Sequence, residues 1–178
     1  MENQYESPVH LEIDEAVAPQ EIISVNKFII LAILTLGIYQ IWWIYKAWRF
    51  FQQKDRLNIM PAARAIFSIF FLNALFKRIM SFALEKGYHE NYTSELLVAG
   101  FIFTNVMTRL PDPYWLIAIF SFVFLIPPFK AFNYARVNAP DLVVIQQSSF
   151  NSKQIVLIVL GSILWILNLA APFLGVES

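Results

Sequence analysis

The chain of 178 residues contains no cysteine, few glycines and only two histidines. The absence of cysteine excludes disulfides and thiolate metal sites. There is also no glycine-rich phosphate loop and no nucleophile elbow. His89 has the acidic neighbours Glu85, Glu90 and Glu95, but the second histidine, His10, is far away in the N-terminal tail, so a zinc ligand set is incomplete. The sequence therefore predicts no metal, no cofactor and no enzymatic activity.

Basic residues are missing from the start of the chain. All six charged residues before Lys27 are acidic, namely Glu2, Glu6, Glu12, Asp14, Glu15 and Glu21. A signal peptide needs a basic start and an apolar core, and residues 1–26 have neither. We expect residues 1–26 to be an acidic, disordered tail.

Charge is absent again between Lys27 and Lys46, where residues 28–45 form a continuous uncharged run. A helix of about 18 such residues nearly matches the hydrocarbon thickness of a bilayer. The composition agrees, because 58% of the residues are hydrophobic, 16% are aromatic and the mean hydropathy is +0.55. The sequence therefore predicts a protein that lives in a membrane.

Further uncharged runs predict membrane spans near residues 93–109, 113–129 and 154–176, in addition to 28–45. The pair 93–109 and 113–129 could instead form a re-entrant hairpin, because the run that starts at Leu96 is short. The sequence thus predicts one all-α domain over residues 27–176, an integral membrane helical bundle with about four spanning helices.

One or two interfacial amphipathic helices should accompany the spans. The first covers residues 61–84, where Pro61 suits the first helical turn. Its apolar side chains fall on one stripe, made of Ile69, Leu72, Phe76, Ile79, Met80 and Ala83. A shorter element of the same kind is expected after Pro128.

The positions of lysine and arginine predict the orientation, because cations near span ends are retained on the cytoplasmic side. In a four-span arrangement with the N-terminus outside, 11 of the 13 cations lie inside, and only Lys27 and Arg109 lie outside. We therefore expect a multi-pass protein of the inner membrane with both termini outside. A two-span arrangement leaves the termini where they are.

Residues 27–46 resemble a family of small bacterial inner-membrane proteins known only as a domain of unknown function. The likeness centres on Thr35-Leu36-Gly37 with Tyr39, Trp43, Tyr45 and Lys46. A second similar patch covers residues 61–79, so the likeness extends over about a quarter of the chain. It implies a bacterial, multi-span membrane protein and carries no catalytic or binding residues.

Two groups of side chains are candidates for lipid or partner contacts. The aromatic group is typical of the membrane interface, with Lys46 and Arg49 beside it, and consists of Tyr39, Trp42, Trp43, Tyr45 and Trp48. The alternative is an aromatic cage for a lipid headgroup or a cationic ligand. The second group is a candidate pocket for anionic lipid, made of Lys77, Arg78, Lys130 and Arg136.

These features favour a non-enzymatic scaffold, regulatory or lipid-interacting component of the bacterial envelope. The expected partners are membrane lipids with anionic headgroups and either a membrane protein or a second copy of the chain, but not nucleic acid. The alternative is a subunit of a small-solute channel or transporter, with a path lined by Thr104, Asn105, Ser121 and Asn168. The lack of charge within the predicted spans weighs against ion-coupled transport. A lipid-modifying enzyme that uses His89 is a third possibility.

Overall fold

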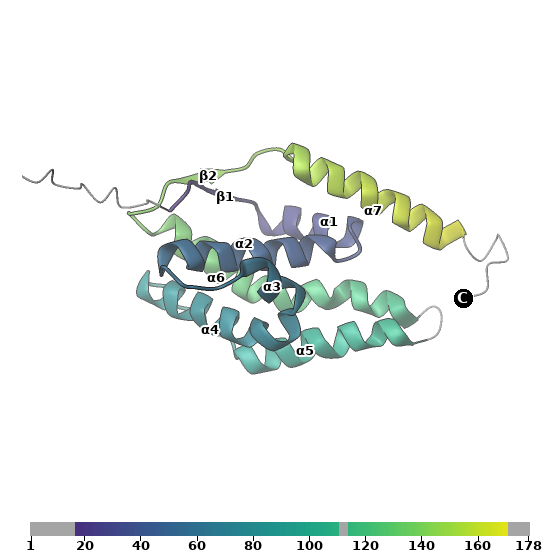
Figure 1. Cartoon of the computed structure of the whole chain (residues 1–178), viewed down its shortest axis with the longest axis horizontal. Helices are drawn as coiled ribbons and strands as arrows, with labels where there is room; N and C mark the ends of the chain where they lie inside the picture. The colour runs from purple at the N-terminus through teal and green to yellow at the C-terminus, as the bar shows by residue number, and fades with distance from the viewer. Residues whose placement is uncertain (1–16, 111–113, 171–178) are drawn as a thin grey trace, which may run out of the picture.

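The computed structural model describes residues 17–110 and 114–170 and is built mainly of helices (Figure 1). The α-helices are α1 (Val25–Leu34), α2 (Ile38–Lys54), α3 (Pro61–Ile66), α4 (Ser68–Glu85), α5 (Ser94–Val106), α6 (Ile126–Val137) and α7 (Ser152–Ala170). Two 3-10 helices, η1 (Met107–Arg109) and η2 (Tyr114–Leu125), and two short strands, β1 (Gln20–Ile22) and β2 (Val144–Gln146), complete the described part. The predicted all-α class is confirmed.

The predicted first span, residues 28–45, is not one continuous helix. The chain turns between α1 and α2, where Leu36 (φ 49°) and Gly37 (φ 87°) both adopt left-handed conformations. The Thr35 hydroxyl holds this turn, since it donates to the Leu31 carbonyl (2.7 Å) and accepts from the Tyr39 amide (3.0 Å). Figure 1 shows the chain entering α1 and leaving α2 toward the same end of the molecule. The uncharged run therefore forms a helical hairpin.

The first described residues belong to the fold and not to a tail. β1 pairs in parallel with β2, with Gln20 opposite Val144. The Lys27 ammonium donates to the backbone carbonyls of Gln147 and Ser148, just after β2. Residues 20–22 of the expected disordered tail are thus part of a sheet, and Lys27 lies beside the start of α7. Residues 1–16 of the expected tail lie outside the described residues.

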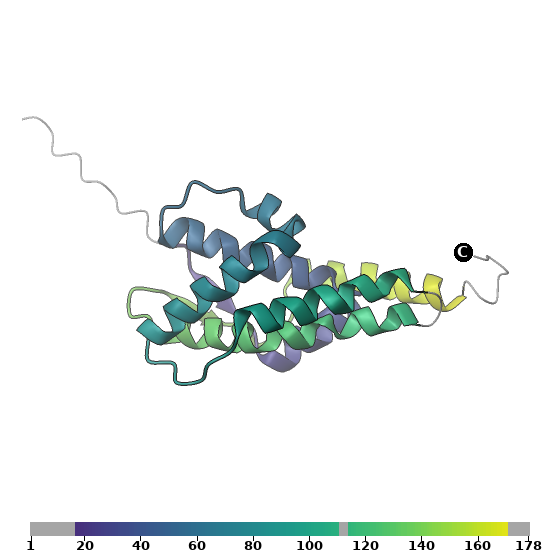
Figure 2. The same ribbon diagram turned by 90° about the horizontal axis from the view of Figure 1, so that it is seen from below.

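The predicted spans near 93–109 and 113–129 form an antiparallel pair, in which α5 and η1 run out to residue 110 and η2 runs back from residue 114 (Figure 2). Pro127 and Pro128 do not end this return segment. They occupy the first turn of α6, where a missing amide proton is tolerated, so the helix continues to Val137. The short element expected after Pro128 is therefore the second half of the same long helix.

Two helical segments in the described ranges are long and apolar enough to cross a membrane, Leu116–Val137 with 22 residues and Ser152–Ala170 with 19 residues. The expected number of about four is not reached, because α1 has only 10 residues and α5 only 13. The predicted last span, 154–176, corresponds to α7, and its residues 171–176 lie outside the described part.

The predicted interfacial helix, residues 61–84, corresponds to α3 and α4, which are separated at Phe67. Most of its predicted stripe is buried against the bundle, and Ile69 is the member that stays exposed. Exposed apolar side chains gather at the junction of the two helices, namely Met60, Ile66, Phe67, Ile69 and Phe70. The element therefore covers the bundle with one face and presents an apolar edge with another.

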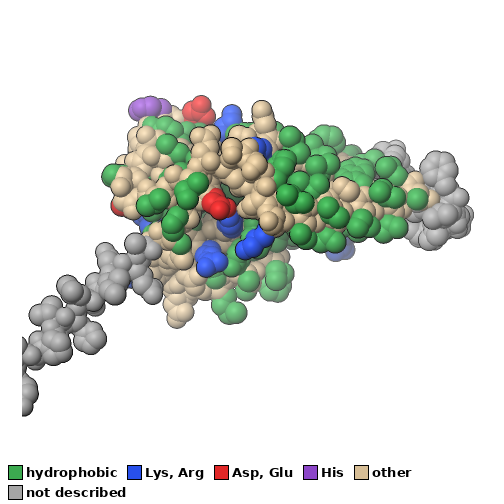
Figure 3. All heavy atoms as spheres, turned by 90° about the horizontal axis from the view of Figure 1, so that it is seen from above, with side chains coloured by type: hydrophobic (Ala, Val, Ile, Leu, Met, Phe, Trp, Pro, Cys, Tyr) green, Lys and Arg blue, Asp and Glu red, His purple; other side chains and the backbone are tan. Residues whose placement is uncertain are grey.

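Charged and apolar surfaces are separated along the long axis of the molecule. In Figure 3 the half that contains the α7 end is covered almost entirely by apolar side chains, and acidic and basic groups gather over the other half. Within α7, only Gln154 and Gly161 are buried. Large exposed side chains on the apolar half include Phe103, Phe120, Val159, Leu160, Ile163 and Ile166. We call these two halves the charged end and the apolar end.

Candidate functional site

A small cavity lies at the charged end, where β1, α2, α6 and the start of α7 meet. Its volume is about 30 Å³. It is lined by aromatic, amide and cationic side chains, namely Glu21, Ile23, Tyr39, Trp43, Lys46, Phe129, Phe132, Arg136, Gln147 and Gln154. We call it the Arg136 cavity.

The start of α7 brings amide groups to this cavity. Asn151 and Gln154 form a reciprocal cap, because the Asn151 side chain accepts from the Gln154 amide (2.9 Å) and the Gln154 side chain accepts from the Asn151 amide (3.0 Å). The Gln154 side chain also contacts Gln147 (2.7 Å) and, at 3.3 Å, donates to the Tyr39 hydroxyl. Gln154 is therefore held in one orientation at the cavity wall.

Arg136 is the most unusual group of the cavity. Its side chain belongs to a residue that is only 7% exposed, yet no carboxylate lies within ion-pair distance of it in the described part of the chain. The guanidinium donates to the Asn133 side chain (2.5 Å) and stacks over the Phe132 ring, 4.1 Å from its centroid. Its Nε atom is buried and has no hydrogen-bond partner. A buried positive charge is thus left without a neutralising anion.

Lys46 adds a second positive charge to the same cavity. Although the residue is exposed overall, partial desolvation lowers the pKa of its ammonium below the ordinary lysine value, and Glu21 acts in the opposite direction. Glu21 is the acidic residue of the cavity lining, and the Asn151 side chain donates to its carboxylate at 3.4 Å. The lining therefore holds two cations and one exposed acid.

The predicted aromatic group is split by the structure. Tyr39 and Trp43 line the Arg136 cavity, whereas Trp48 is fully buried and carries the Arg64 guanidinium 4.4 Å from its ring centroid. Trp42 lies beside Tyr45, at 5.4 Å between ring centroids, and below the Lys153 ammonium at 6.0 Å. The ring faces are thus partly covered by the chain's own cations, which disfavours a cage for an external cation.

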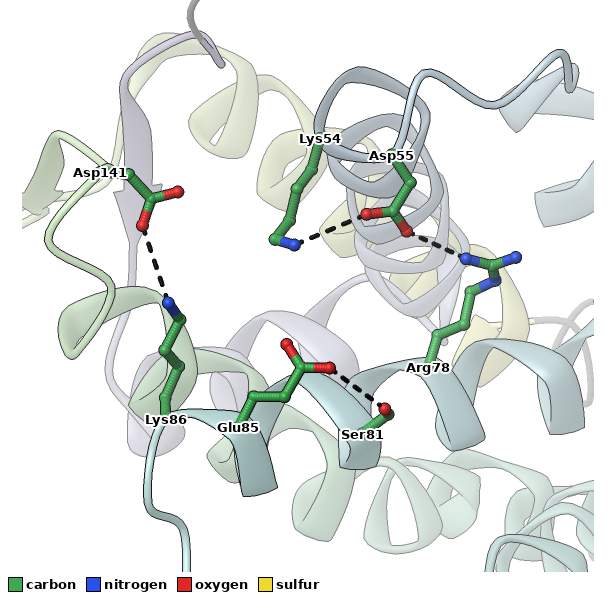
Figure 4. Close-up of polar contacts among 7 residues, drawn as sticks. All are labelled: Lys54, Asp55, Arg78, Ser81, Glu85, Lys86 and Asp141. Atoms are coloured by element: carbon green, nitrogen blue, oxygen red, sulfur yellow. Dashed lines mark hydrogen bonds and ion pairs between the residues drawn. The ribbon is translucent and has the colours of Figure 1, made fainter.

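The predicted basic pocket is not assembled as expected. Lys77 pairs with Glu95 at 2.6 Å, and Arg78 pairs with Asp55 at 2.9 Å (Figure 4). Lys130 and Arg49 are exposed and do not line the Arg136 cavity. Of the four residues predicted for this pocket, only Arg136 reaches the cavity, and its cationic companion there is Lys46.

The polar residues predicted to line a solute path do not converge. Asn105 and Ser121 line a second cavity of about 200 Å³ near the turn between α1 and α2. There the Ser121 hydroxyl contacts the buried Gln40 amide oxygen at 3.0 Å. Thr104 and Asn168 instead bond to carbonyls of their own helices. Of the four predicted residues, only Asn105 and Ser121 therefore line the same cavity.

The acidic patch around His89 does not gather either. Glu95 is engaged by Lys77, and Glu90 accepts a hydrogen bond from the Tyr88 hydroxyl at 3.0 Å. Within residues 17–110 and 114–170, no group of three histidine, cysteine or acidic side chains could hold a metal ion.

Sequence reasoning missed Glu21, Gln147 and Gln154 as parts of the cavity. The pattern of Asn151 followed three residues later by Gln154 is a capping signature and could have located the start of α7. Nothing in the sequence indicates that β1 brings Glu21 next to Lys46.

Comparison with protein-family models, curated proteins and solved structures gave no match. The resemblance of residues 27–46 to a bacterial inner-membrane family therefore stays a prediction.

Proposed function

We propose that this chain is an integral protein of the bacterial inner membrane that carries out no chemistry itself and acts as a scaffold or regulatory component through contacts with anionic lipids. The observation that carries the proposal is the outer surface of α7, where nearly every side chain is apolar and exposed. An apolar surface of this extent is unfavourable in water and favourable among acyl chains.

The dimensions support this placement. A helix of 19 residues rises by about 28 Å, close to the hydrocarbon thickness of a bilayer. The charged end begins where α7 begins, with Lys153 in its first turn. A membrane that covers the apolar end therefore meets the cations at its surface, where each contributes about 1 kcal/mol of attraction to anionic lipid.

The proposed topology differs from the one expected from charges alone. In this topology the hairpin of α1 and α2 enters the bilayer and returns, since ten residues of α1 rise only about 15 Å. The strand β1 then lies on the inner side together with Lys27, and α7 leaves toward the outside. Arg109, at the far tip of the α5–η2 pair, is the cation that faces outward.

Single cysteines test this arrangement, because the natural chain has none. We choose Val137→Cys at the charged end, Leu110→Cys at the far tip and Leu160→Cys on the outer face of α7, all at exposed positions. In sealed inverted vesicles a membrane-impermeant maleimide should label position 137 only. In right-side-out vesicles it should label position 110 only, and position 160 should react only after detergent is added. Labelling of all three positions from one side would contradict the proposal.

The proposed preference for anionic lipids is tested by a separate measurement of the lipids that the protein retains. The protein extracted in mild detergent should retain phosphatidylglycerol or cardiolipin in preference to phosphatidylcholine, as read by native mass spectrometry. Equal retention of anionic and zwitterionic lipids would remove this part of the proposal while leaving the membrane placement intact.

A further inference from the structure

The Arg136 cavity contains positive charge that no side chain of the described residues neutralises. Two other cations at the charged end have carboxylate partners, since Arg78 pairs with Asp55 and Lys86 pairs with Asp141 (Figure 4). Arg136 is more deeply buried than either of them, and no acidic side chain of the described residues reaches it. A buried charge without a partner costs several kcal/mol, so a missing anion is the simplest explanation for its position.

The other polar groups of the cavity are suited to an oxyanion. Two buried donors of lining residues have no acceptor, the Arg136 Nε and the Trp43 Nε1. Lys46 supplies an ammonium, and the Gln154 side chain forms part of the wall, where its Nε2 group donates to the Tyr39 hydroxyl and the Gln147 side chain. Guanidinium and ammonium groups with such donors are the usual ligands of phosphate oxygens.

The size of the cavity limits what can enter. A volume of about 30 Å³ has room for about two water-sized groups. Two oxygens of a phosphate fit this space, whereas an acyl chain or a sugar does not. The one acidic lining residue, Glu21, is exposed and contacts Asn151, so its carboxylate does not occupy the place beside the Arg136 guanidinium.

We propose that the Arg136 cavity is a binding site for a phosphate group, held by Arg136 and Lys46 beside the Gln154 side chain. The phosphate belongs either to the headgroup of an anionic phospholipid or to a free phosphate ion. The headgroup version rests on the proposed membrane placement, because the cavity adjoins the first turn of α7, where the headgroups would lie. The free-ion version does not depend on it.

The test uses the full-length protein in a neutral detergent and a phosphate-free buffer. One arm titrates inorganic phosphate, with sulfate as a second oxyanion, and the other adds phosphatidylglycerol or phosphatidylcholine. Binding is read as an upward shift of the unfolding temperature and, for lipid, as retained adducts in native mass spectrometry. The variants are Arg136→Gln, Lys46→Gln and Gln154→Glu. The last of these places a negative charge at the cavity wall. Lys130→Gln is the matched control, since Lys130 is an exposed cation of the same helix α6 outside the cavity.

We expect at least one arm to stabilise the natural chain, with an affinity about tenfold weaker in the three cavity variants and unchanged in Lys130→Gln. A response to phosphatidylglycerol alone assigns a headgroup site, and a response to inorganic phosphate alone assigns a free-ion site. Lys46→Gln and Gln154→Glu keep the test decisive if Arg136→Gln does not fold. The proposal is overturned if neither arm stabilises the natural chain, or if Lys46→Gln and Gln154→Glu bind as well as Lys130→Gln. Flotation of every variant with vesicles reports separately on the membrane placement.

Discussion

Gly161 of α7 lies so close to Leu34 of α1 that a Cβ atom at position 161 would come within 2.1 Å of the Leu34 carbonyl oxygen. The contact is made by backbone atoms, which cannot move aside as a flexible side chain can. One helix turn away, the Trp165 indole donates to the Ile33 carbonyl at 3.1 Å. These two contacts fix α7 against the end of α1.

Substitution Gly161→Ala should therefore separate α7 from α1. We expect a loss of about 1–3 kcal/mol in the free energy of unfolding, the range typical of overpacked positions. Ser162→Ala is the control, because it adds no atom at the neighbouring position. Chemical unfolding in detergent, followed by the fluorescence of the tryptophans, measures the difference. A Gly161→Ala protein as stable as Ser162→Ala would show that the two helices are not in close contact.

The turn between α1 and α2 should depend on the hydroxyl of Thr35. Thr35→Val keeps the shape but removes both the donor to Leu31 and the acceptor for the Tyr39 amide. Loss of such a cap costs about 1 kcal/mol. Thr35→Ser keeps the hydroxyl and should stay close to the natural chain in unfolding experiments. A larger loss for Thr35→Ser than for Thr35→Val would assign the role of Thr35 to its methyl group instead.

Gly37 gives an independent test of the same turn. Its φ of 87° lies in the left-handed region, where a Cβ atom costs about 1–2 kcal/mol. Gly37→Ala should lower the free energy of unfolding by this amount. Gly100 is not a suitable control, because a Cβ there meets the Phe124 ring. Ser162→Ala serves again, and a neutral Gly37→Ala would mean that residues 28–45 form a straight helix.

Lys46 should make the free energy of unfolding of the ligand-free protein change with pH in the alkaline range. Partial desolvation lowers the pKa of its ammonium in the folded chain, so the unfolded chain binds that proton more tightly. The unfolding free energy contributed by Lys46 therefore rises as pH increases from below the folded pKa to the ordinary lysine value. Lys46→Met lacks this dependence, and its stability advantage over the natural chain should shrink as the pH rises toward the ordinary lysine pKa in phosphate-free buffer. A constant difference across this range would contradict the assignment.

A charged substitution on the exposed face of α7 distinguishes a lipid environment from an aqueous one. Leu160 is 51% exposed, and in water an exposed leucine can be replaced by aspartate with little effect. At the centre of a spanning helix an aspartate alone costs about 2.5–3.5 kcal/mol. Leu160→Asp should therefore reduce insertion, measured as protein that resists alkaline extraction from membranes. Val143→Asp, at an exposed position just before β2, should insert normally. Equal insertion of both variants would place α7 in water.

The sequence predicted the helical class and the buried face of α4, because these depend on periodic spacing within a single helix. Hydropathy alone did not reveal the turn at Leu36 and Gly37, since both sides of the turn are equally apolar. The charge pattern places the end of the predicted tail at residue 26. It does not reveal the pairing of β1 with β2, because this pairing joins segments that are more than a hundred residues apart.

The cavity was predicted only in part for a similar reason. Arg136 is one of the predicted contact residues and lines the cavity, but its companions there depend on how α2, α6 and α7 are rotated against one another. The sequence does not report these rotations. The sequence analysis therefore groups Lys77 and Arg78 with Arg136 because all three are cations. In the structure, Lys77 pairs with Glu95 and Arg78 pairs with Asp55.

The pairing of β1 with β2 sets the order in which this protein can be completed. Gln20 emerges early during synthesis, but its partner Val144 follows only after most of the helices have been made. Glu21 and Gln154 can thus meet only after the helices between them have been made, and closing so long a loop is slow. Before that moment Glu21 and Gln154 do not yet line the cavity beside Arg136. We therefore expect anion binding only in the folded protein.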